Sequence, residues 1–308
     1  MRLLPALFVP ALLLAVSLPA PLRADVPRVV ADIAPVHSLV AQVMEGLGEP
    51  QLLVRSASSP HGATLRPSQA RALQGADLVV WIGPELTPWL AKPLATLAGQ
   101  AARVGLLNHP GTARLAYRDT MAPGTGAGHD DHPHDHAGSD PHAWLDPDNA
   151  SAWLGVIAEE LAELDPANAG RYRANAAAGQ ERLALLSDRI EARLAPLGEQ
   201  PHVAFHDAFQ YFEHRFGLTL AGSVASGDAT DPGPARLAAL RERVAALGLR
   251  CAFSEPQMNA GLLRTVAEGS GLQLVEIDAL GVALEPGPDL YPELLRRMAD
   301  AVAGCLAR

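Results

Sequence analysis

The hydrophobic residues of this chain fall into short runs that alternate with amphipathic stretches. Eight runs rich in Val, Ile and Leu have the length of buried β-strands and lie at residues 29–33, 51–54, 78–82, 104–107, 203–205, 218–221, 250–253 and 272–277. Helical spacing of apolar residues occurs between them, for example at residues 36–44, 68–73, 87–97 and 235–247. The alternation predicts an α/β fold with mainly parallel sheets.

A much longer helical pattern separates the first four predicted strands from the last four. Asp165 is a suitable N-cap and Pro166 a suitable first helical residue. Apolar or small residues then recur three or four positions apart, at Tyr172, Ala176, Gly179, Leu183, Leu186, Ile190, Leu194 and Leu197. This spacing predicts one amphipathic helix over residues 165–197. Because its stripe would pack along both halves, we expect a rigid connector between an N-terminal lobe (residues 25–164) and a C-terminal lobe (residues 198–308).

The two halves also share a weak sequence similarity. Residues 76–86 resemble residues 249–258, and each segment follows a helical stretch and precedes another helix and strand. An approximate internal repeat, with two similar α/β lobes, would explain this similarity, and so would chance.

The first 24 residues have the features of an export signal. Arg2 precedes an apolar run over residues 3–20, and Ala24 closes a small-residue stretch before Asp25. A membrane anchor is the alternative, but Pro5, Pro10 and Pro19 interrupt the run. We therefore expect residues 1–24 to be a cleaved signal peptide.

Composition narrows the class of protein further. The 308 residues are 48% hydrophobic and 19% charged, which excludes a disordered chain or a coiled coil. A formal net charge of -10 argues against nucleic acid as a partner. Two cysteines are too few for a disulfide scaffold or a four-thiolate zinc site. In an oxidising compartment Cys251 and Cys305 can pair, and two buried free thiols are the alternative.

One segment, residues 121–139, is of low complexity. Its first part is rich in Gly, Ala and Pro, and His129, His132, His134 and His136 follow among acidic residues. This composition predicts a flexible loop. The loop would bind metal ions weakly as a collector or sensor, or it would only solubilise the protein.

Four other residues stand at sequence positions that are typical of metal ligands. His61 follows the predicted strand at 51–54, His142 precedes a helix, and His206 and Asp278 end predicted strands. Imidazole is the commonest ligand for first-row metals, and ligands collect beyond the carboxyl ends of parallel strands. Each residue alone would be a cap or core residue more often than a ligand. Together they would meet only if the two lobes face each other across a cleft.

Several segments in series resemble one protein family. They are the stretches 58–85 around Pro60-His61-Gly62, 140–147 around Asp140-Pro141-His142, 205–212 beginning Phe205-His206-Asp207, 253–257 and 276–281. In this order they are similar to the metal solute-binding proteins that serve bacterial ABC importers, and within that family to the zinc-uptake type. The resemblance covers the whole chain after the export signal.

The resemblance implies two lobes bridged by a long helix, with a metal ion held by the residues matching His61, His142 and His206. A fourth position would be filled by an acid matching Asp278 or by water, because Pro60 stands where some zinc members carry Glu. The His-rich loop and the pair Cys251 and Cys305 also resemble zinc-type members.

The resemblance further implies Zn²⁺ as the bound metal and the periplasm as the location. The implied partners are a membrane permease and its cytoplasmic ATPase, and a periplasmic zinc chaperone is compatible with the same scheme. The protein itself is expected to be a monomer without enzymatic activity.

A manganese-binding homologue and an exported zinc hydrolase are the two alternatives to zinc capture. A manganese-binding homologue would carry Glu in place of His206, and manganese prefers more oxygen ligands than this set offers. An exported zinc hydrolase would also have three protein ligands and an open position, but no HExxH helix occurs. Glu255 would orient a ligand or merely form a turn before Pro256. His37, His109, His202 and His214 are expected at partly or fully exposed positions.

Overall fold

The structure is a computed structural model that describes residues 26–54, 59–118, 120, 138–198, 200–225 and 233–307. The predicted signal peptide and the loop histidines His129, His132, His134 and His136 lie outside the described residues. None of the helices in the described ranges combines the length and apolar character needed to span a membrane.

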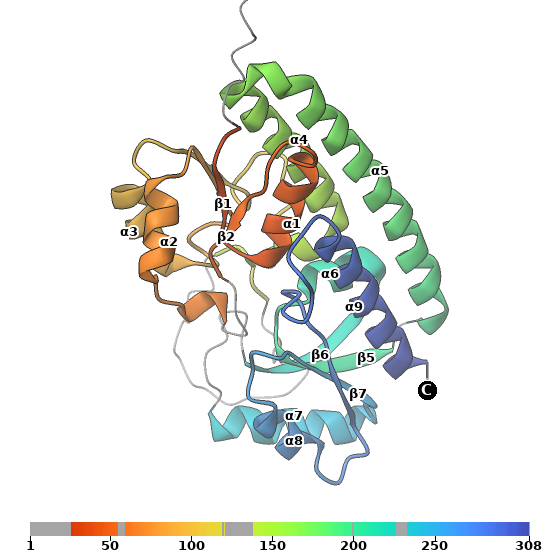
Figure 1. Cartoon of the computed structure of the whole chain (residues 1–308). Coiled ribbons are helices and arrows are strands. Elements are labelled where there is room, and N and C mark those ends of the chain that lie inside the picture. Colours follow the sequence, from red (N-terminus) through yellow and green to blue (C-terminus); the bar gives the residue numbers. More distant parts are fainter. Residues whose placement is uncertain are drawn as a thin grey trace, which may run out of the picture.

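The first half of the chain forms a four-stranded parallel sheet. Its strands are β1 (Val29–Ala31), β2 (Gln51–Leu52), β3 (Leu78–Trp81) and β4 (Ala102–Gly105), in the order β2-β1-β3-β4. The helices around it are α1 (Ala34–Val43), α2 (Pro67–Gln74), α3 (Pro88–Leu97) and α4 (Pro147–Leu164). Helices α2 and α3 cover one face of the sheet, and α1 and α4 cover the other (Figure 1).

The second half repeats this arrangement. Its strands are β5 (Pro201–His206), β6 (Thr219–Ala225), β7 (Cys251–Ser254) and β8 (Gln273–Glu276), in the order β6-β5-β7-β8. Its helices are α6 (Gln210–Phe216), α7 (Pro234–Leu247), α8 (Ala260–Ala267) and α9 (Leu290–Leu306). Helices α7 and α8 lie under the sheet, while α6 and α9 cover its upper face in the view of Figure 1.

Burial on both faces explains why the strands are continuous hydrophobic runs. In β5, Val203 and Phe205 belong to the apolar cluster with α7 and α8, whereas Ala204 belongs to the cluster with α6 and α9. Successive side chains of a strand point to opposite faces, so both sets must be apolar when helices cover both. The α/β prediction is confirmed in both halves.

The two sheets have equivalent strand orders. Segments 76–86 and 249–258, whose similarity suggested a repeat, contain β3 and β7, and each of these strands is third in its sheet. The architecture is therefore two similar parallel-sheet lobes.

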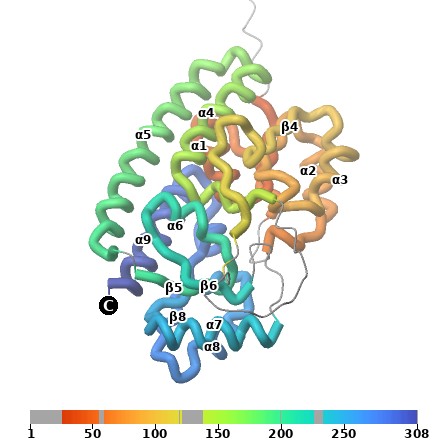
Figure 2. The backbone as a smooth tube through the Cα atoms, turned by 180° about the vertical axis from the view of Figure 1, so that it is seen from behind, coloured from red at the N-terminus to blue at the C-terminus, as the bar shows by residue number. Residues whose placement is uncertain are grey.

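The long helix α5 (Ala169–Leu194) connects the halves and has 26 residues. It is shorter than the predicted span because residues 166–168 and 195–197 form 3₁₀ turns at its two ends. It packs against α1 and α4 of the first half and against α6 and α9 of the second (Figures 1 and 2). One apolar cluster consequently runs from Val29 to Leu306 and joins the lobes.

The buried side of α5 differs from the predicted stripe at one position. Ser187 is 3% exposed, while Leu186, which the spacing predicted to be buried, is only half-buried. Arg215 of α6 donates a hydrogen bond of 3.1 Å to the Ser187 hydroxyl. A polar partner on a neighbouring helix thus makes burial of Ser187 favourable, which no pattern along α5 could indicate.

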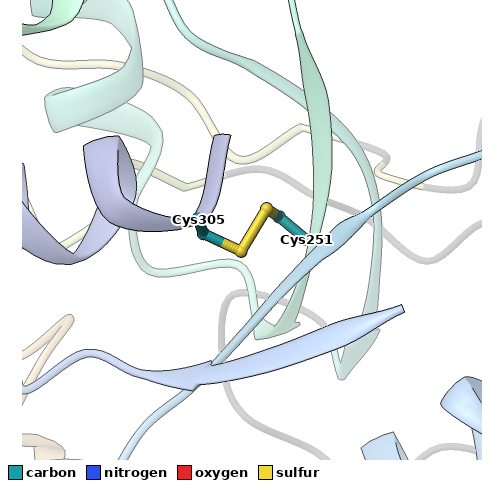
Figure 3. Close-up of a disulfide and its surroundings, with 2 residues drawn as sticks. All are labelled: Cys251 and Cys305. Carbon is teal, nitrogen blue, oxygen red and sulfur yellow. A yellow bond between two sulfur atoms is a disulfide. The ribbon is translucent and has the colours of Figure 1, made fainter. Parts of the chain in front are cut away.

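A disulfide joins Cys251 in β7 to Cys305 in α9, with the two Cα atoms 5.9 Å apart (Figure 3). The bond closes a loop with a sequence separation of 54 residues and fastens the last helix to the second sheet. In the chain-entropy view such a closure stabilises the folded state by about 4 kcal/mol.

Two histidines are more deeply buried than their sequence context indicated. His202 in β5 is 1% exposed, and its Nε2 lies 2.8 Å from Glu213 Oε1. His37 in α1 is 8% exposed, with Nε2 3.1 Å from the Pro50 carbonyl. A specific acceptor makes each burial favourable, and neither acceptor is adjacent in sequence.

Candidate metal centre

Three histidines from distant parts of the chain meet between the two sheets. His61 lies in a 3₁₀ turn (Pro60–Gly62), His142 directly precedes another 3₁₀ turn (Ala143–Leu145), and His206 is the last residue of β5. One nitrogen of each ring lies within 4.8 Å of the others. The ring centroids are 5.5 Å (His61 to His142), 5.7 Å (His61 to His206) and 4.9 Å (His142 to His206) apart.

This donor set suits a zinc ion. Zinc–nitrogen bonds are about 2.0–2.1 Å long, so a tetrahedral site requires nitrogens about 3.4 Å apart, and small ring rotations would bring these three to that separation. Of the His, Cys, Asp and Glu side chains in the described ranges, only these three converge as a group able to hold a metal.

His142 is oriented by Asp140. The Asp140 Oδ1 atom accepts a hydrogen bond of 2.9 Å from the His142 backbone nitrogen and lies 2.7 Å from the ring atom Nδ1. Because Nδ1 then carries the proton, Nε2 is left with a free lone pair for a metal. Burial, and after it the charge of His206, holds the pKa of His142 well below its usual value, so the ring is neutral as a ligand must be.

Asp140 is itself almost completely buried, at 1% exposure. Burial raises the pKa of Asp140 to about 7, although the hydrogen bond from the His142 backbone opposes that rise. Sequence reasoning missed this residue; its signal was the spacing of two between Asp140 and His142, which permits an Asx-type turn.

His206 faces a second carboxylate. Its Nδ1 lies 3.3 and 3.4 Å from the two carboxylate oxygens of Glu255, which is 6% exposed. Glu255 also begins a turn, because its carbonyl accepts a hydrogen bond of 3.0 Å from the Met258 backbone nitrogen. The two roles considered for Glu255, orienting a ligand and forming a turn, are therefore both present.

His61 is held differently, through its backbone. Trp89 Nε1, on α3, donates a hydrogen bond of 2.8 Å to the carbonyl of Pro60, and the Ser59 hydroxyl accepts a longer bond of 3.4 Å from the His61 backbone nitrogen. His61 is half-buried, whereas His142 and His206 are 3% and 2% exposed. It therefore forms the outer side of the site.

Asp278, the proposed fourth ligand, is not brought to the three imidazoles. Its Oδ1 accepts a hydrogen bond of 3.2 Å from the Leu280 backbone nitrogen, and its Oδ2 accepts one of 3.0 Å from the Ala283 backbone nitrogen. The end of β8 does reach the site, since Ala279 and Leu280 line the cavity beside the histidines. The Asp278 side chain caps its own loop instead, a local competition that short polar side chains often win.

The cavity at the site is small. It has room for about 10 Å³, roughly a single water-sized probe. Its walls are formed by the following residues: Ser59, Pro60, His61, His142, Trp144, His206, Glu255, Gln257, Met258, Ala279 and Leu280. A single metal ion is the occupant that this space and these side chains fit.

A buried charge network lies behind His206. The Arg118 guanidinium donates to both carboxylate oxygens of Asp207, at 2.6 to 3.2 Å, and contacts Glu213, which also faces His202. Burial alone would lower the pKa of Arg118, but Asp207 and Glu213 raise it, so the guanidinium stays charged. The network attaches Arg118 to Asp207, which directly follows His206, and to Glu213 of α6.

Two parallel-sheet lobes, a rigid connecting helix and a three-histidine site between the sheets define a metal-binding solute-binding protein. Residues 29–305 match the family described as "Zinc-uptake complex component A periplasmic", ZnuA. The chain belongs to this family.

Similar proteins extend over nearly the whole chain. It is 44% identical to the high-affinity zinc uptake system protein ZnuA of Paracoccus denitrificans over 93% of this chain and 94% of that protein. It is 36% identical to the protein of the same name from Brucella suis over the full length of both. A crystal structure of a ZnuA superposes with a TM-score of 0.77 at 22% identity, covering 92% of this chain and all of that one, which supports the fold.

Proposed function

We propose that the protein captures Zn²⁺ between its lobes and delivers it to an ABC-type zinc importer. The observation that carries the proposal is the convergence of His61, His142 and His206 within 4.8 Å, two of them backed by buried carboxylates. Membership of a periplasmic zinc-uptake family supports zinc as the cargo.

Zinc is favoured over manganese by the donor set. Three imidazole nitrogens suit zinc, whereas manganese prefers carboxylate and water oxygens. Asp278 would add a carboxylate oxygen to the donor set, the ligand type that manganese prefers. Its two oxygens instead accept hydrogen bonds from backbone nitrogens of its own loop.

We propose one tight zinc site at the three histidines. Its fourth ligand is Asp278 or water, and the orientation of the Asp278 carboxylate supports water. The residues His129, His132, His134 and His136 are proposed to form weaker auxiliary sites in the loop over 121–139.

The expected setting is the periplasm, after removal of residues 1–24. Residues 25–164 form the N-terminal lobe in this proposal, 165–197 the linker helix and 198–308 the C-terminal lobe. The partners are the membrane permease of the importer and its cytoplasmic ATPase. A periplasmic zinc chaperone would donate the ion, and the protein would act as a monomer that carries out no chemical reaction.

Competition titration against a zinc chelator tests the proposal. The wild-type protein should bind one equivalent tightly, and His142→Ala should bind it at least tenfold more weakly, because a tight ligand is replaced by water. Deletion of residues 121–137 should remove only weaker equivalents. Wild-type affinity in His142→Ala would refute the site, and sustained hydrolysis of ester or peptide substrates by the zinc-loaded protein would refute the carrier function.

A further inference from the structure

The cavity at the site is also lined by an amide side chain, that of Gln257. The side-chain nitrogen Nε2 of Gln257 is buried, and the structure provides no hydrogen-bond partner for it within the described residues. The same side chain lines the cavity with His61, His142 and His206. Buried amide N–H groups in folded proteins are almost always paired, so an unpaired one on a side chain that lines a binding cavity indicates a missing acceptor.

The local backbone holds Gln257 in this position. Residues 255–258 form a turn closed by the hydrogen bond from the Met258 nitrogen to the Glu255 carbonyl, with Pro256 at its second position, where proline is favoured. The turn follows β7 directly, and it presents both Glu255 and Gln257 to the cavity. Gln257 is therefore placed by the same rigid element as the carboxylate that faces His206.

The metal itself is also missing a ligand. Zinc in such sites is four-coordinate, and the protein brings three imidazoles together. Asp278, the acid at the end of β8, points its two oxygens at backbone nitrogens of its own loop. The cavity lined by Gln257 and the three histidines is where the ion and a fourth ligand would lie.

We propose that Gln257 is a positioning residue for the fourth zinc ligand: its Nε2 donates a hydrogen bond to the oxygen of a water molecule that completes the coordination of the ion. This inference rests on the proposed zinc capture at the three histidines. The Gln257 amide would thereby gain a hydrogen-bond acceptor, and the zinc ion would gain the fourth ligand that the three histidines do not supply.

A neutral amide fits this role better than an acid would. Asp140 and Glu255 already place two carboxyl groups behind the imidazoles, where they contact ring nitrogens of His142 and His206. An amide holds the water without adding charge. A water ligand held by one hydrogen bond can also be exchanged readily, as the release of a transported ion requires.

The inference is tested by comparing Gln257→Leu with Met258→Leu. Both side chains line the cavity, but only Gln257 can donate a hydrogen bond. Gln257→Leu should weaken zinc binding about fivefold to tenfold, the effect of losing one hydrogen bond to a bound ligand, while Met258→Leu should change the affinity less than about twofold. The visible absorption bands of the cobalt-substituted protein should shift in Gln257→Leu and not in Met258→Leu, because only the former disturbs the ligand water.

A second measurement does not depend on any variant. The zinc-loaded wild-type structure should show an oxygen of a water molecule on the ion within hydrogen-bond distance of Gln257 Nε2. A carboxylate of Asp278 or Glu255 in that position would overturn the inference. So would unchanged zinc affinity and an unchanged cobalt spectrum in a folded Gln257→Leu protein.

Different results would contradict the proposed zinc capture and the proposed role of Gln257. If the wild-type protein binds no zinc tightly, or if His142→Ala binds it normally, the proposed function is wrong. If the wild-type protein binds zinc through the three histidines and Gln257→Leu matches it in affinity and spectrum, only the role of Gln257 is wrong.

Discussion

The indole nitrogen of Trp89 donates a hydrogen bond of 2.8 Å to the carbonyl of Pro60, the residue immediately before the candidate ligand His61. Trp89 lies on α3, and its ring packs against the apolar cluster between α2, α3 and the first sheet. The turn that carries His61 is thus fastened to the outer helices of the first lobe. His142 and His206, by contrast, are oriented by carboxylates.

Trp89→Phe should therefore accelerate zinc release. The phenyl ring preserves most of the packing but cannot donate to Pro60, so the His61 turn becomes less restrained and its ligand dissociates more often. We expect the dissociation rate, measured by stopped-flow mixing with a chelator, to rise about threefold to tenfold. Trp81→Phe is the matched control, because Trp81 packs against the same apolar cluster. Equal rates in the two variants would contradict a specific role for Trp89.

Asp140→Ala should weaken zinc binding without removing any direct ligand. The variant loses the acceptor that holds both the backbone and the ring of His142. Loss of such an outer carboxylate typically costs about 10–100-fold in metal affinity. Isothermal or competition titration measures the effect, and Asp146→Ala serves as the control because Asp146 caps the backbone nitrogen of Asp148. A zinc affinity equal to that of the control would show that His142 needs no orienting carboxylate.

Gly179→Ala should destabilise the contact between α5 and the first lobe. A Cβ atom on Gly179 would lie 2.8 Å from Cδ1 of the fully buried Leu154 and 3.1 Å from Oε1 of Gln42. Overpacking of this kind costs about 1–3 kcal/mol, which exceeds the gain in helix propensity of about 1 kcal/mol. Urea unfolding should show a lower free energy of unfolding for this variant.

Gly170→Ala in the same helix is the matched comparison. A Cβ atom there meets nothing within 4 Å, so only the helix-propensity gain of up to about 1 kcal/mol remains. The two substitutions should thus shift the free energy of unfolding in opposite directions. A stabilising Gly179→Ala would mean that Leu154 moves aside more freely than its burial indicates.

Asp32 should make the zinc-free protein less stable as the pH rises from about 4 to about 7. The side chain is fully buried after β1 and accepts hydrogen bonds from the backbone nitrogens of Ile33 (2.8 Å) and Ile82 (2.9 Å). Burial raises its pKa to about 7, and these hydrogen bonds offset only part of the rise. Since the folded state binds the Asp32 proton more tightly than the unfolded state, its stabilising contribution is complete below pH 4 and is lost through pH 7.

Unfolding free energies measured across that range for wild type and Asp32→Asn would isolate this contribution, because the amide does not titrate. Asp77→Asn provides a comparison of opposite sign when the measurements are extended below pH 4. Hydrogen bonds from Arg28 lower the pKa of Asp77, so its contribution is present above about pH 4 and declines at more acidic pH. A wild-type curve parallel to that of Asp32→Asn would show that Asp32 does not titrate in this range.

The arrangement of strands and helices could be predicted from the sequence because it follows from local periodicity. Eight hydrophobic runs became the eight strands of two parallel sheets, and the long repeat of apolar positions became α5. Such patterns indicate which residues are buried. Buried positions recur every two residues in a strand and every 3.6 residues in a helix, whatever the element packs against. Ser187 is buried in place of Leu186 because Arg215, on another helix, donates a hydrogen bond to the Ser187 hydroxyl.

Only part of the candidate site could be predicted from the sequence. His61, His142 and His206 were recognisable because they stand at strand ends or turns within motifs of a known family, and the structure brings their rings together. Asp278 satisfied the same positional rule, yet its side chain turned to the backbone of its own loop. Position along a strand determines where a side chain begins, but the hydrogen bonds available in the folded loop determine where it points.

The sequence by itself determined the two-lobe α/β plan and the long connecting helix, since both follow from residue types at a regular spacing. It indicated the three imidazoles through their positions at strand ends or turns and through motifs that resemble a known family. Only the tertiary structure decided which residues surround the imidazoles: Asp140 behind His142, Glu255 behind His206, Trp89 beside the His61 turn, and Gln257 in the wall of the cavity. Of these, only Asp140 is close to its histidine in sequence. The hydrogen bond from Trp89 to Pro60 joins distant segments of the first lobe, and the contact of Glu255 with His206 joins distant segments of the second. Their physical basis is the packing of helices and strands within each lobe, which no local pattern contains.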